Sequence, residues 1–425
     1  MSYSNHRKLI VGLSGGILIT FIFLNSLVFK LLVNFPRIFG LYQPTKVIVL
    51  LQNNHELRPT GGFMGSYATF TFDKFKIKDF QTYDIYDADG HVPNYIIPPE
   101  AIQTAFQLGS WRLRDANWSP DFPQSAKTIL WFLGQAGIDA PDILAAVNLS
   151  AVEKVFKFLP HDLYLSDYDL DVSADTLWDI TQQHSQSDFF PGSKQKKEFI
   201  YDLSKELINE LAKLSAAQKI KLVSTLTGLF KEKDVQVYSA DPAIQKTFSE
   251  LELSGSLKKP FCPSLIPFCT PERIEIIEAN LGSNKSNCCV TRRVKLEVEK
   301  NGQTIDHKLK ITFSNQDNDQ NKKWGGKYLA NIRLFVNDEV MEKWVNILPG
   351  TEQTVDFDYQ LLSSNKYYFQ AKFQMFPLRN YLLFLLKVPT LQNLLFPVLN
   401  LCLHLSLSLS KQFCRLKQVL IPFLH

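Results

Sequence analysis

The chain of 425 residues lacks the short motifs that identify a common enzyme chemistry. It contains no P-loop, no GxSxG nucleophile turn, no HExxH helix and no GxGxxG dinucleotide turn. Its six cysteines form no CxxC pair, and no Cys/His spacing suits zinc. The 46 basic and 42 acidic residues leave a net charge of only +4. No dense Lys/Arg stripe is interleaved with aromatic residues, so we expect no nucleic-acid partner.

What the chain does contain indicates a large packed body. Thirty-two Phe and fifteen Tyr are typical of a globular protein, and the length is enough for two folded units. Six cysteines are compatible with an extracytoplasmic setting. Cys262 and Cys269 enclose a six-residue loop that a disulfide could close, although the adjacent Cys288 and Cys289 could pair with either of them.

The N-terminal region predicts a membrane anchor. Residues 9–32 read LIVGLSGGILITFIFLNSLVFKLL, and the first 21 of them carry no charge. About 20 apolar residues cross a bilayer. His6, Arg7 and Lys8 favour an inside N-terminus, whereas Lys30 weakens that bias. A cleaved signal peptide is the rival interpretation, but no alanine precedes Ala68 to supply an A-x-A site. We therefore expect a cytoplasmic tail at 1–8, an anchor at 9–32 in the cell membrane, and an extracytoplasmic body.

The body divides by pattern into two parts. Residues 44–250 alternate strand-like and helix-like segments, with strands within 46–86, an irregular stretch at 87–125 and a strong amphipathic helix at 196–214. This alternation predicts an α/β domain. After a linker at 251–271, rich in Pro, Ser and Cys, the period changes to two. Two alternating segments flank Asn301-Gly302, which predicts a hairpin within an antiparallel, sandwich-like β domain at 272–375.

Residues 376–425 are an apolar tail whose status the sequence leaves open. Lys387, Pro389 and Pro397 interrupt it, so it contains no clean span of 20 apolar residues. The alternatives are a second membrane segment, an interfacial helix, a tail unrelated to the fold, or a frameshifted reading frame.

The most informative segment is 54–66, NHELRPTGGFMGS, which lies between two predicted strands. Its glycines allow positive φ, and an arginine beside such a turn can hold a phosphate or carboxylate. The plainer alternative is a tight turn in which Glu56 and Arg58 pair with each other.

This segment resembles the opening motif of an uncharacterised bacterial family, domain of unknown function 4012. Residues 115–123, DANWSPDFP, and 278–286, EANLGSNKS, resemble the same family. The α/β part more distantly resembles the LytR–CpsA–Psr proteins, which are membrane-anchored and transfer glycans from polyprenyl pyrophosphate to the cell wall. That resemblance lies in the order of elements. The arginine-aspartate signature expected after the second strand is missing, and the sequence there reads Gln81-Thr82-Tyr83-Asp84.

The resemblance implies a cationic site for a polyprenyl-phosphate-linked glycan or another cell-wall polymer, with a divalent cation such as Mg²⁺ as a candidate cofactor. It leaves open whether the protein is a glycopolymer transferase or a non-enzymatic envelope binding module. The candidate anion-binding residues are Glu56, Arg58, Gly61, Gly62, Arg112, Arg114, Lys196 and Lys197. The candidate catalytic carboxylates are Asp115 and Asp121, for which turn and N-cap roles are the alternative. A solvated helix start is the alternative for the lysines.

Overall fold

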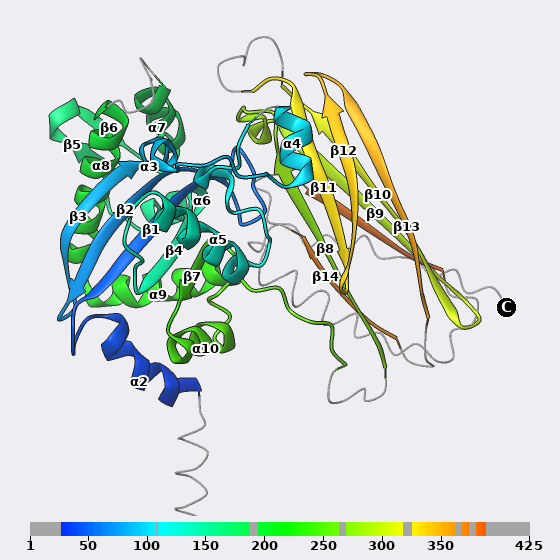
Figure 1. The fold of residues 1–425 in the computed structure, drawn as a ribbon, viewed down its shortest axis with the longest axis horizontal. Coiled ribbons are helices and arrows are strands. Elements are labelled where there is room, and N and C mark those ends of the chain that lie inside the picture. The colour runs from blue at the N-terminus through cyan, green and yellow to red at the C-terminus, as the bar shows by residue number, and fades with distance from the viewer. Residues whose placement is uncertain are drawn as a thin grey trace, which may run out of the picture. The chain divides into compact units, whose positions relative to one another are not determined.

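The computed structural model describes residues 27–107, 109–186, 194–262, 269–317, 325–362, 367–373 and 380–387. Two compact units are present, residues 1–257 and residues 258–425 (Figure 1). The first is a mixed α/β unit and the second is built from strands. Each unit is described separately below.

A five-stranded mixed sheet in the order β3-β2-β1-β4-β7 forms the centre of the first unit. β1 runs antiparallel to β2 and parallel to β4, while β2–β3 and β4–β7 are antiparallel pairs. β1, β3 and β4 therefore point the same way. The strands are β1 (Thr45–Asn53), β2 (Phe63–Asp73), β3 (Lys76–Asp84), β4 (Ile143–Asn148) and β7 (Val235–Ser239).

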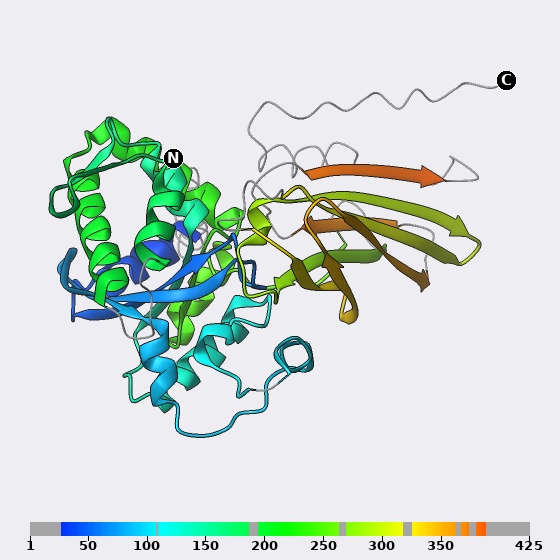
Figure 2. The same cartoon turned by 90° about the horizontal axis from the view of Figure 1, so that it is seen from above.

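Helices lie on both faces of this sheet (Figures 1 and 2). Ile48 and Leu50 of β1 face a core that includes Phe122 and Phe132 of α5, because side chains alternate along a strand. Val47 belongs to a second core shared with α2 and α10. The helices are α2 (Leu27–Ile38), α3 (Ile85–His91), α4 (Glu100–Phe106), α5 (Phe122–Gln135), α6 (Leu149–Phe156), α7 (Leu177–Gln186), α8 (Lys194–Lys213), α9 (Ala216–Lys231) and α10 (Pro242–Glu250).

Local signals explain several helix starts. Ser215 and Gln218 form a capping box at the start of α9. Asp241 accepts hydrogen bonds from two backbone N–H groups of α10, whose first residue is Pro242. A two-stranded hairpin of β5 (Leu163–Leu165) and β6 (Leu170–Val172) joins a third core with α6, α7 and α8.

Two four-stranded sheets make up the second unit, in the orders β13-β10-β9-β15 and β12-β11-β8-β14. Both contribute to one apolar core, which makes the unit sandwich-like. The strands are β8 (Thr270–Asn280), β9 (Val290–Asn301), β10 (Thr304–Asn315), β11 (Tyr328–Val336), β12 (Glu339–Ile347), β13 (Glu352–Leu362), β14 (Tyr367–Phe373) and β15 (Asn380–Lys387). The hairpin predicted at Asn301-Gly302 is confirmed, since Asn301 pairs with Thr304.

The structure corrects several expectations. The stretch 87–125 contains α4 and the short 3₁₀ helix η1 (Leu113–Asp115), so it is not wholly irregular. The β unit is not purely antiparallel, because β14 pairs parallel to β8 and β15 parallel to β9. β15 also brings residues 380–387 of the apolar tail into a sheet, whereas residues 388–425 lie outside the described residues.

The predicted anchor falls largely outside the described part of the chain, which begins at residue 27. Among the residues that are described, no helix has the length and apolar character needed to cross a membrane. Disulfides join Cys262 to Cys269 and Cys288 to Cys289, so the two adjacent cysteines pair with each other.

Candidate functional site

The candidate site lies where β1, β3 and β4 end. These three strands point the same way, so their carboxyl ends Asn53, Asp84 and Asn148 lie along one edge of the sheet. The motif segment 54–62 leaves β1 at this edge and returns as β2. Ligands of open α/β sheets commonly bind outside the carboxyl ends of the strands. The sheet therefore places the motif where such sites form.

Arg58 is the centre of a buried ion cluster at this edge. Its side chain is 2% exposed. Nε and Nη2 donate to the same oxygen of Asp115 at 3.1 and 3.0 Å, and Nη2 donates to Glu56 at 3.3 Å. The guanidinium also lies over the ring of Phe63, 5.2 Å from its centroid. Burial alone would lower the pKa of Arg58, but the two carboxylates outweigh this and raise it. Arg58 thus holds the loop to η1.

Arg114 carries the cluster outward to solvent. Its side chain is 34% exposed, and its Nη1 donates to Asp89 at 2.8 Å. Its Nε lies 3.7 Å from Asp115, so Arg58 and Arg114 approach the same carboxylate from different sides. The guanidinium lies 5.1 Å from the centroid of the Tyr86 ring. Burial raises the pKa of Asp89, against the opposing effect of Arg114.

Lys196 reaches the same region from α8. Its Nζ donates to the carbonyl of Gly65 at 2.6 Å and to the carboxylate of Asp84 at 3.1 Å. The other oxygen of Asp84 accepts from the backbone N–H of Tyr86 and so caps α3. These contacts fix the first turn of α8 over β2 and β3. They also bring a third cation to the edge that Arg58 and Arg114 occupy.

Thr60, Gly61 and Gly62 are locked in place by buried amides. Asn117 donates to the Thr60 hydroxyl at 2.8 Å and to the Gly62 carbonyl at 2.9 Å. Gly61 has a φ of +135°, and a Cβ there would lie 2.4 Å from the Asn148 side chain. A Cβ on Gly62 would lie 2.4 Å from the backbone of Asn53. The glycines are therefore needed for close approach.

A second ion cluster lies beside the loop. Asp234 is buried and accepts from Asn148 at 3.2 Å, from the Ser150 hydroxyl at 2.8 Å and from Lys154 at 2.6 Å. Lys154 also pairs with Glu232 at 2.5 Å. The cluster ties the end of β4 and the start of α6 to the start of β7.

The structure shows Arg112, Asp121 and Lys197 in hydrogen bonds that hold neighbouring segments of the backbone. Arg112 donates to the carbonyls of Asp89 and Val92, both at 3.4 Å. Asp121 is the N-cap residue of α5, and its carbonyl accepts from Ser125 at 3.0 Å. The Lys197 carbonyl accepts from Thr82. Within the described ranges, no group of three or more His, Cys, Asp or Glu residues could hold a metal ion.

Sequence reasoning missed Asp84, Asp89, Tyr86 and Asp234 as members of the site. The sequence analysis mentioned Asp84 only because it stands where the arginine-aspartate signature is missing. Its N-cap position before α3 is the signal that could have found it. The other three carry no local signal, because their partners come from distant segments.

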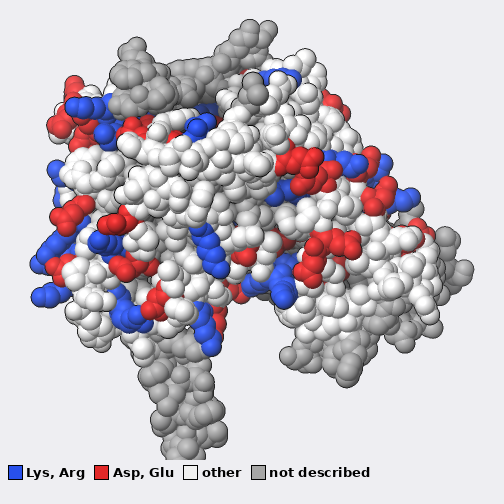
Figure 3. Space-filling model, viewed as in Figure 1, with Lys and Arg blue, Asp and Glu red and all other residues white. Residues whose placement is uncertain are grey.

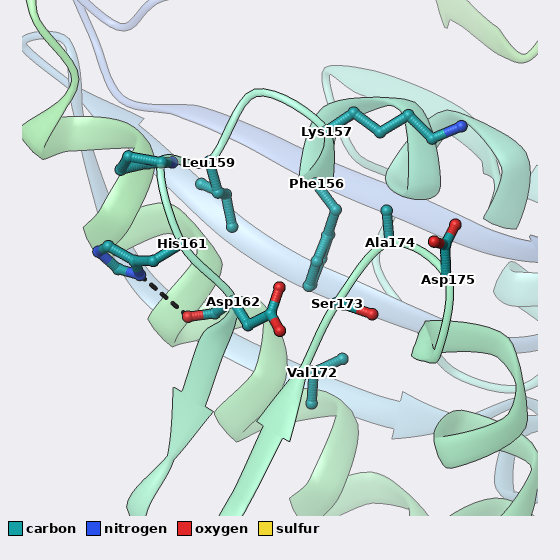
Figure 4. Close-up of a pocket in the computed structure, with 10 residues that line it drawn as sticks. Phe156, Lys157, Leu159, His161, Asp162, Val172, Ser173, Ala174 and Asp175 are labelled. Carbon is teal, nitrogen blue, oxygen red and sulfur yellow. Dashed lines mark hydrogen bonds between the residues drawn. The ribbon is translucent and has the colours of Figure 1, made fainter.

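A pocket of 270 Å³ opens elsewhere in the first unit, between the end of α6, the loop before β5 and the segment that joins β6 to α7 (Figure 4). The His161 ring shares a hydrogen bond of 2.9 Å with the Asp162 carbonyl. Asp162, Ser173 and Asp175 line the pocket together with Phe156. The volume is slightly below the roughly 300–1,000 Å³ of most ligand pockets. It is too small for a polyprenyl chain, and we do not place the anion site there.

The stretch 278–286 is part of a buried network of polar side chains in the second unit. Glu278 is fully buried and bonds to Arg292, Tyr328 and Asn287. Asn280 donates to Asn287 at 2.8 Å and to the carbonyl of Asn284 at 3.1 Å. This motif therefore fixes the start of β9 against β8 and β11.

No curated protein matches the chain. The solved structures to which it is similar include TagV of B. subtilis, with 11% identity over 54% of this chain and 89% of that one. They also include the Lin1025 protein of Listeria innocua, with 9% identity over 50% of this chain and 80% of that one. Both have a TM-score of 0.27, and we draw no functional conclusion from them.

The family comparison is firmer and covers the part of the candidate site that residues 43–185 form, whereas Lys196 and Asp234 lie beyond it. The stretches 54–66 and 115–123 lie within the match, whereas 278–286 lies beyond it. Over residues 43–185 the chain matches the family described as protein of unknown function (DUF4012), which confirms the resemblance that the 54–66 motif indicated.

Proposed function

We propose that this is a membrane-anchored cell-envelope protein whose first unit binds a polyprenyl-phosphate-linked glycan through its phosphate. The phosphate contacts Arg114 and Lys196 at the carboxyl edge of the sheet. Arg58 does not contact the phosphate, but it holds Asp115, the carboxylate that Arg114 also approaches. The resemblance of the element order to LytR–CpsA–Psr proteins supplies the ligand class. Transfer of the glycan to a wall polymer is the corresponding reaction.

The observation that carries the proposal is the position of Arg114. Its guanidinium is one-third exposed, yet Asp89 and the Tyr86 ring hold it in place. An arginine that is partly exposed and already held in place loses little freedom when a phosphate binds. Lys196 adds a second charge at the same edge, from a different segment of the chain.

The chemistry that the site supports is binding and charge neutralisation. Asp115 is engaged by Arg58 and Arg114, and the carbonyl of Asp121 serves the start of α5. We assign both carboxylates supporting roles. Among the described residues, no group of three or more His, Cys, Asp or Glu side chains could hold Mg²⁺.

Titration calorimetry of the full chain in detergent tests the proposal, with inorganic pyrophosphate and a short polyprenyl diphosphate as probes. Arg114→Ala should weaken binding about tenfold or more, because a charged hydrogen bond contributes roughly 1.5–3 kcal/mol. Lys213→Ala, on the same helix as Lys196 and 66% exposed, is the matched control. Binding that is equal in Arg114→Ala and the control would overturn the assignment.

A non-enzymatic envelope binding module is the second candidate. The balance of charges favours it, since Glu56, Asp84, Asp89 and Asp115 face Arg58, Arg114 and Lys196. Mass spectrometry of lipids that co-purify with the protein separates the two. A bound prenyl phosphate supports the first candidate, and its absence together with failed pyrophosphate binding supports the second.

A further inference from the structure

The opposite end of the first sheet carries an apolar surface that no part of the described chain covers. It is formed by the end of α2, the turn after it and the tip of the β2–β3 hairpin. Its exposed apolar residues are Val33, Phe35, Leu41, Tyr42, Phe75 and Ile77. We call these six residues the basal surface. Exposed aromatic side chains gathered in this way mark an interaction surface.

The two segments that carry the basal surface are joined to each other. The ring of Phe35 lies 4.3 Å from that of Phe39 and 5.8 Å from that of Phe75. The backbone N–H of Phe75 donates to the Phe39 carbonyl at 3.0 Å, and that of Lys74 donates to Gly40 at 2.9 Å. These bonds join the hairpin tip to the end of α2.

α2 is in turn fixed to the rest of the first unit. Asn34 is buried and donates to the Thr247 hydroxyl of α10 at 2.8 Å. Arg37 pairs with Asp241 at 2.5 Å. The direction in which the chain enters α2 is therefore set relative to the sheet.

The hairpin tip keeps a phenylalanine in a strained conformation. Asp73 pairs with Lys76, so Lys74 and Phe75 are the two central residues of the turn. Their φ values are +51° and +65°. Such turns favour Asn-Gly, and positive φ is unusual for a bulky residue. The Phe75 ring lies against the rings of Phe35 and Phe39, yet about half of its side chain remains exposed, so burial in the body does not by itself explain the strained position.

Lysines flank Phe75 along the chain. The tip reads Lys74-Phe75-Lys76-Ile77-Lys78, with lysine alternating with an apolar residue. Lys78 pairs with Asp73 at 2.5 Å. Figure 3 shows Lys and Arg side chains along the lower margin of the first unit, with acidic side chains between them. Aromatic rings flanked by lysine are suited to the interface of an anionic bilayer, where the rings enter the headgroup layer and the ammonium groups meet phosphates.

We propose that the basal surface rests on an anionic lipid bilayer, with Phe75 inserted into its interface. The sequence favours this occupant, because the uncharged run of 21 residues starting at Leu9 leads directly into α2. Contact through this surface would also orient the first unit, because it determines which end of the sheet faces the membrane. The inference rests on the membrane attachment in the proposed function and not on its anion site.

Brominated lipids test this placement by quenching tryptophan emission. The full chain is reconstituted into phosphatidylcholine–phosphatidylglycerol vesicles, and Phe75→Trp is compared with the parent chain and its six native tryptophans. The added emission should be quenched by acyl-chain bromines. Tyr95→Trp is the matched control, since Tyr95 is 65% exposed and follows α3, which begins at the carboxyl end of β3. Its added emission should be unaffected.

A second variant separates insertion from folding. Phe75→Gly relieves the positive φ, so it should raise the melting temperature while making lipid contact weaker. Lys74→Gln with Lys76→Gln, added to Phe75→Trp, should reduce the quenching of the introduced tryptophan in anionic vesicles. If the chain incorporates but the added tryptophan is not quenched, or is quenched no more than the control, the basal surface does not contact lipid. If the chain fails to incorporate at all, the membrane attachment itself is wrong.

Discussion

Arg58 and Asp115 lie 57 positions apart in the sequence, yet two nitrogens of one donate to a single carboxylate oxygen of the other. An ammonium group on a lysine stem cannot reproduce this fork and also reach Glu56. The geometry of this pair therefore requires a guanidinium, and a positive charge alone would not satisfy it.

Arg58→Lys should lower the free energy of unfolding by about 2–4 kcal/mol, since it leaves buried carboxylates short of donors. Chemical denaturation measures the change. Arg37→Lys is the matched control, because Arg37 is 43% exposed in its pair with Asp241 and should cost less than about 1 kcal/mol. If the two variants lose the same stability, Arg58 is not a structural centre.

Gly61→Ala should destabilise the fold by more than about 1 kcal/mol, because φ is positive and the new Cβ would meet Asn148 at 2.4 Å. Gly62→Ala should behave similarly through its clash with the Asn53 backbone. Gly65→Ala is the control, since the nearest atom to its Cβ would be the Lys196 Nζ at 3.6 Å, an ordinary contact. Thermal melts of the three variants should rank Gly65→Ala closest to the parent.

His184 should make the first unit less stable in mild acid. Its ring stacks on Phe199 at 4.4 Å, and burial lowers its pKa. The unfolded chain, with a pKa of about 6.5, then binds the proton more tightly. This contribution to stability is complete above about pH 6.5 and is lost as the pH falls through the lowered folded pKa. The melting temperature should therefore depend less on pH across this range in His184→Phe than in the parent chain. The same dependence on pH in both proteins would contradict the prediction.

Arg292→Met in the second unit should cost about 3–5 kcal/mol, because it leaves the fully buried Glu278 without its cation. Replacing both partners, with Glu278→Gln and Arg292→Met, should cost less than Arg292→Met alone. Urea denaturation of the single and double variants measures the difference. A double variant as unstable as the sum of its parts would show that the two residues act independently.

Sequence patterns predicted the elements whose signals are local. The amphipathic run at 196–214 corresponds to α8, and Asn301-Gly302 lies at the β9–β10 turn. β8 was missed because it reads as polar. Its Glu272, Glu275 and Glu278 are nevertheless buried, since residues such as His307, Arg273 and Arg292 pair with them.

The candidate site could be predicted only in part for the same reason. The 54–66 motif predicted the loop that contains Arg58, and the pairing of Glu56 with Arg58, which the structure shows, was one of its two alternatives. The contact from Lys196 to Gly65 spans 131 positions, and no periodicity within α8 reports it. Whether a charged side chain points to solvent or to a buried partner depends on tertiary contacts, which local patterns do not contain.

The length of β1 also constrains how a lipid-linked ligand could reach the site. Nine residues at about 3.3 Å each separate the two ends of this strand by roughly 25–30 Å. That is close to the thickness of the hydrocarbon core of a bilayer, about 30 Å. With the basal surface on the membrane and β1 along the membrane normal, the edge of the sheet at which β1 ends would lie at about that height. A phosphate whose prenyl chain remains within the bilayer could not reach a site at that distance from the membrane surface. The ligand would therefore have to be lifted out of the leaflet, or delivered by another carrier, before it met the arginine.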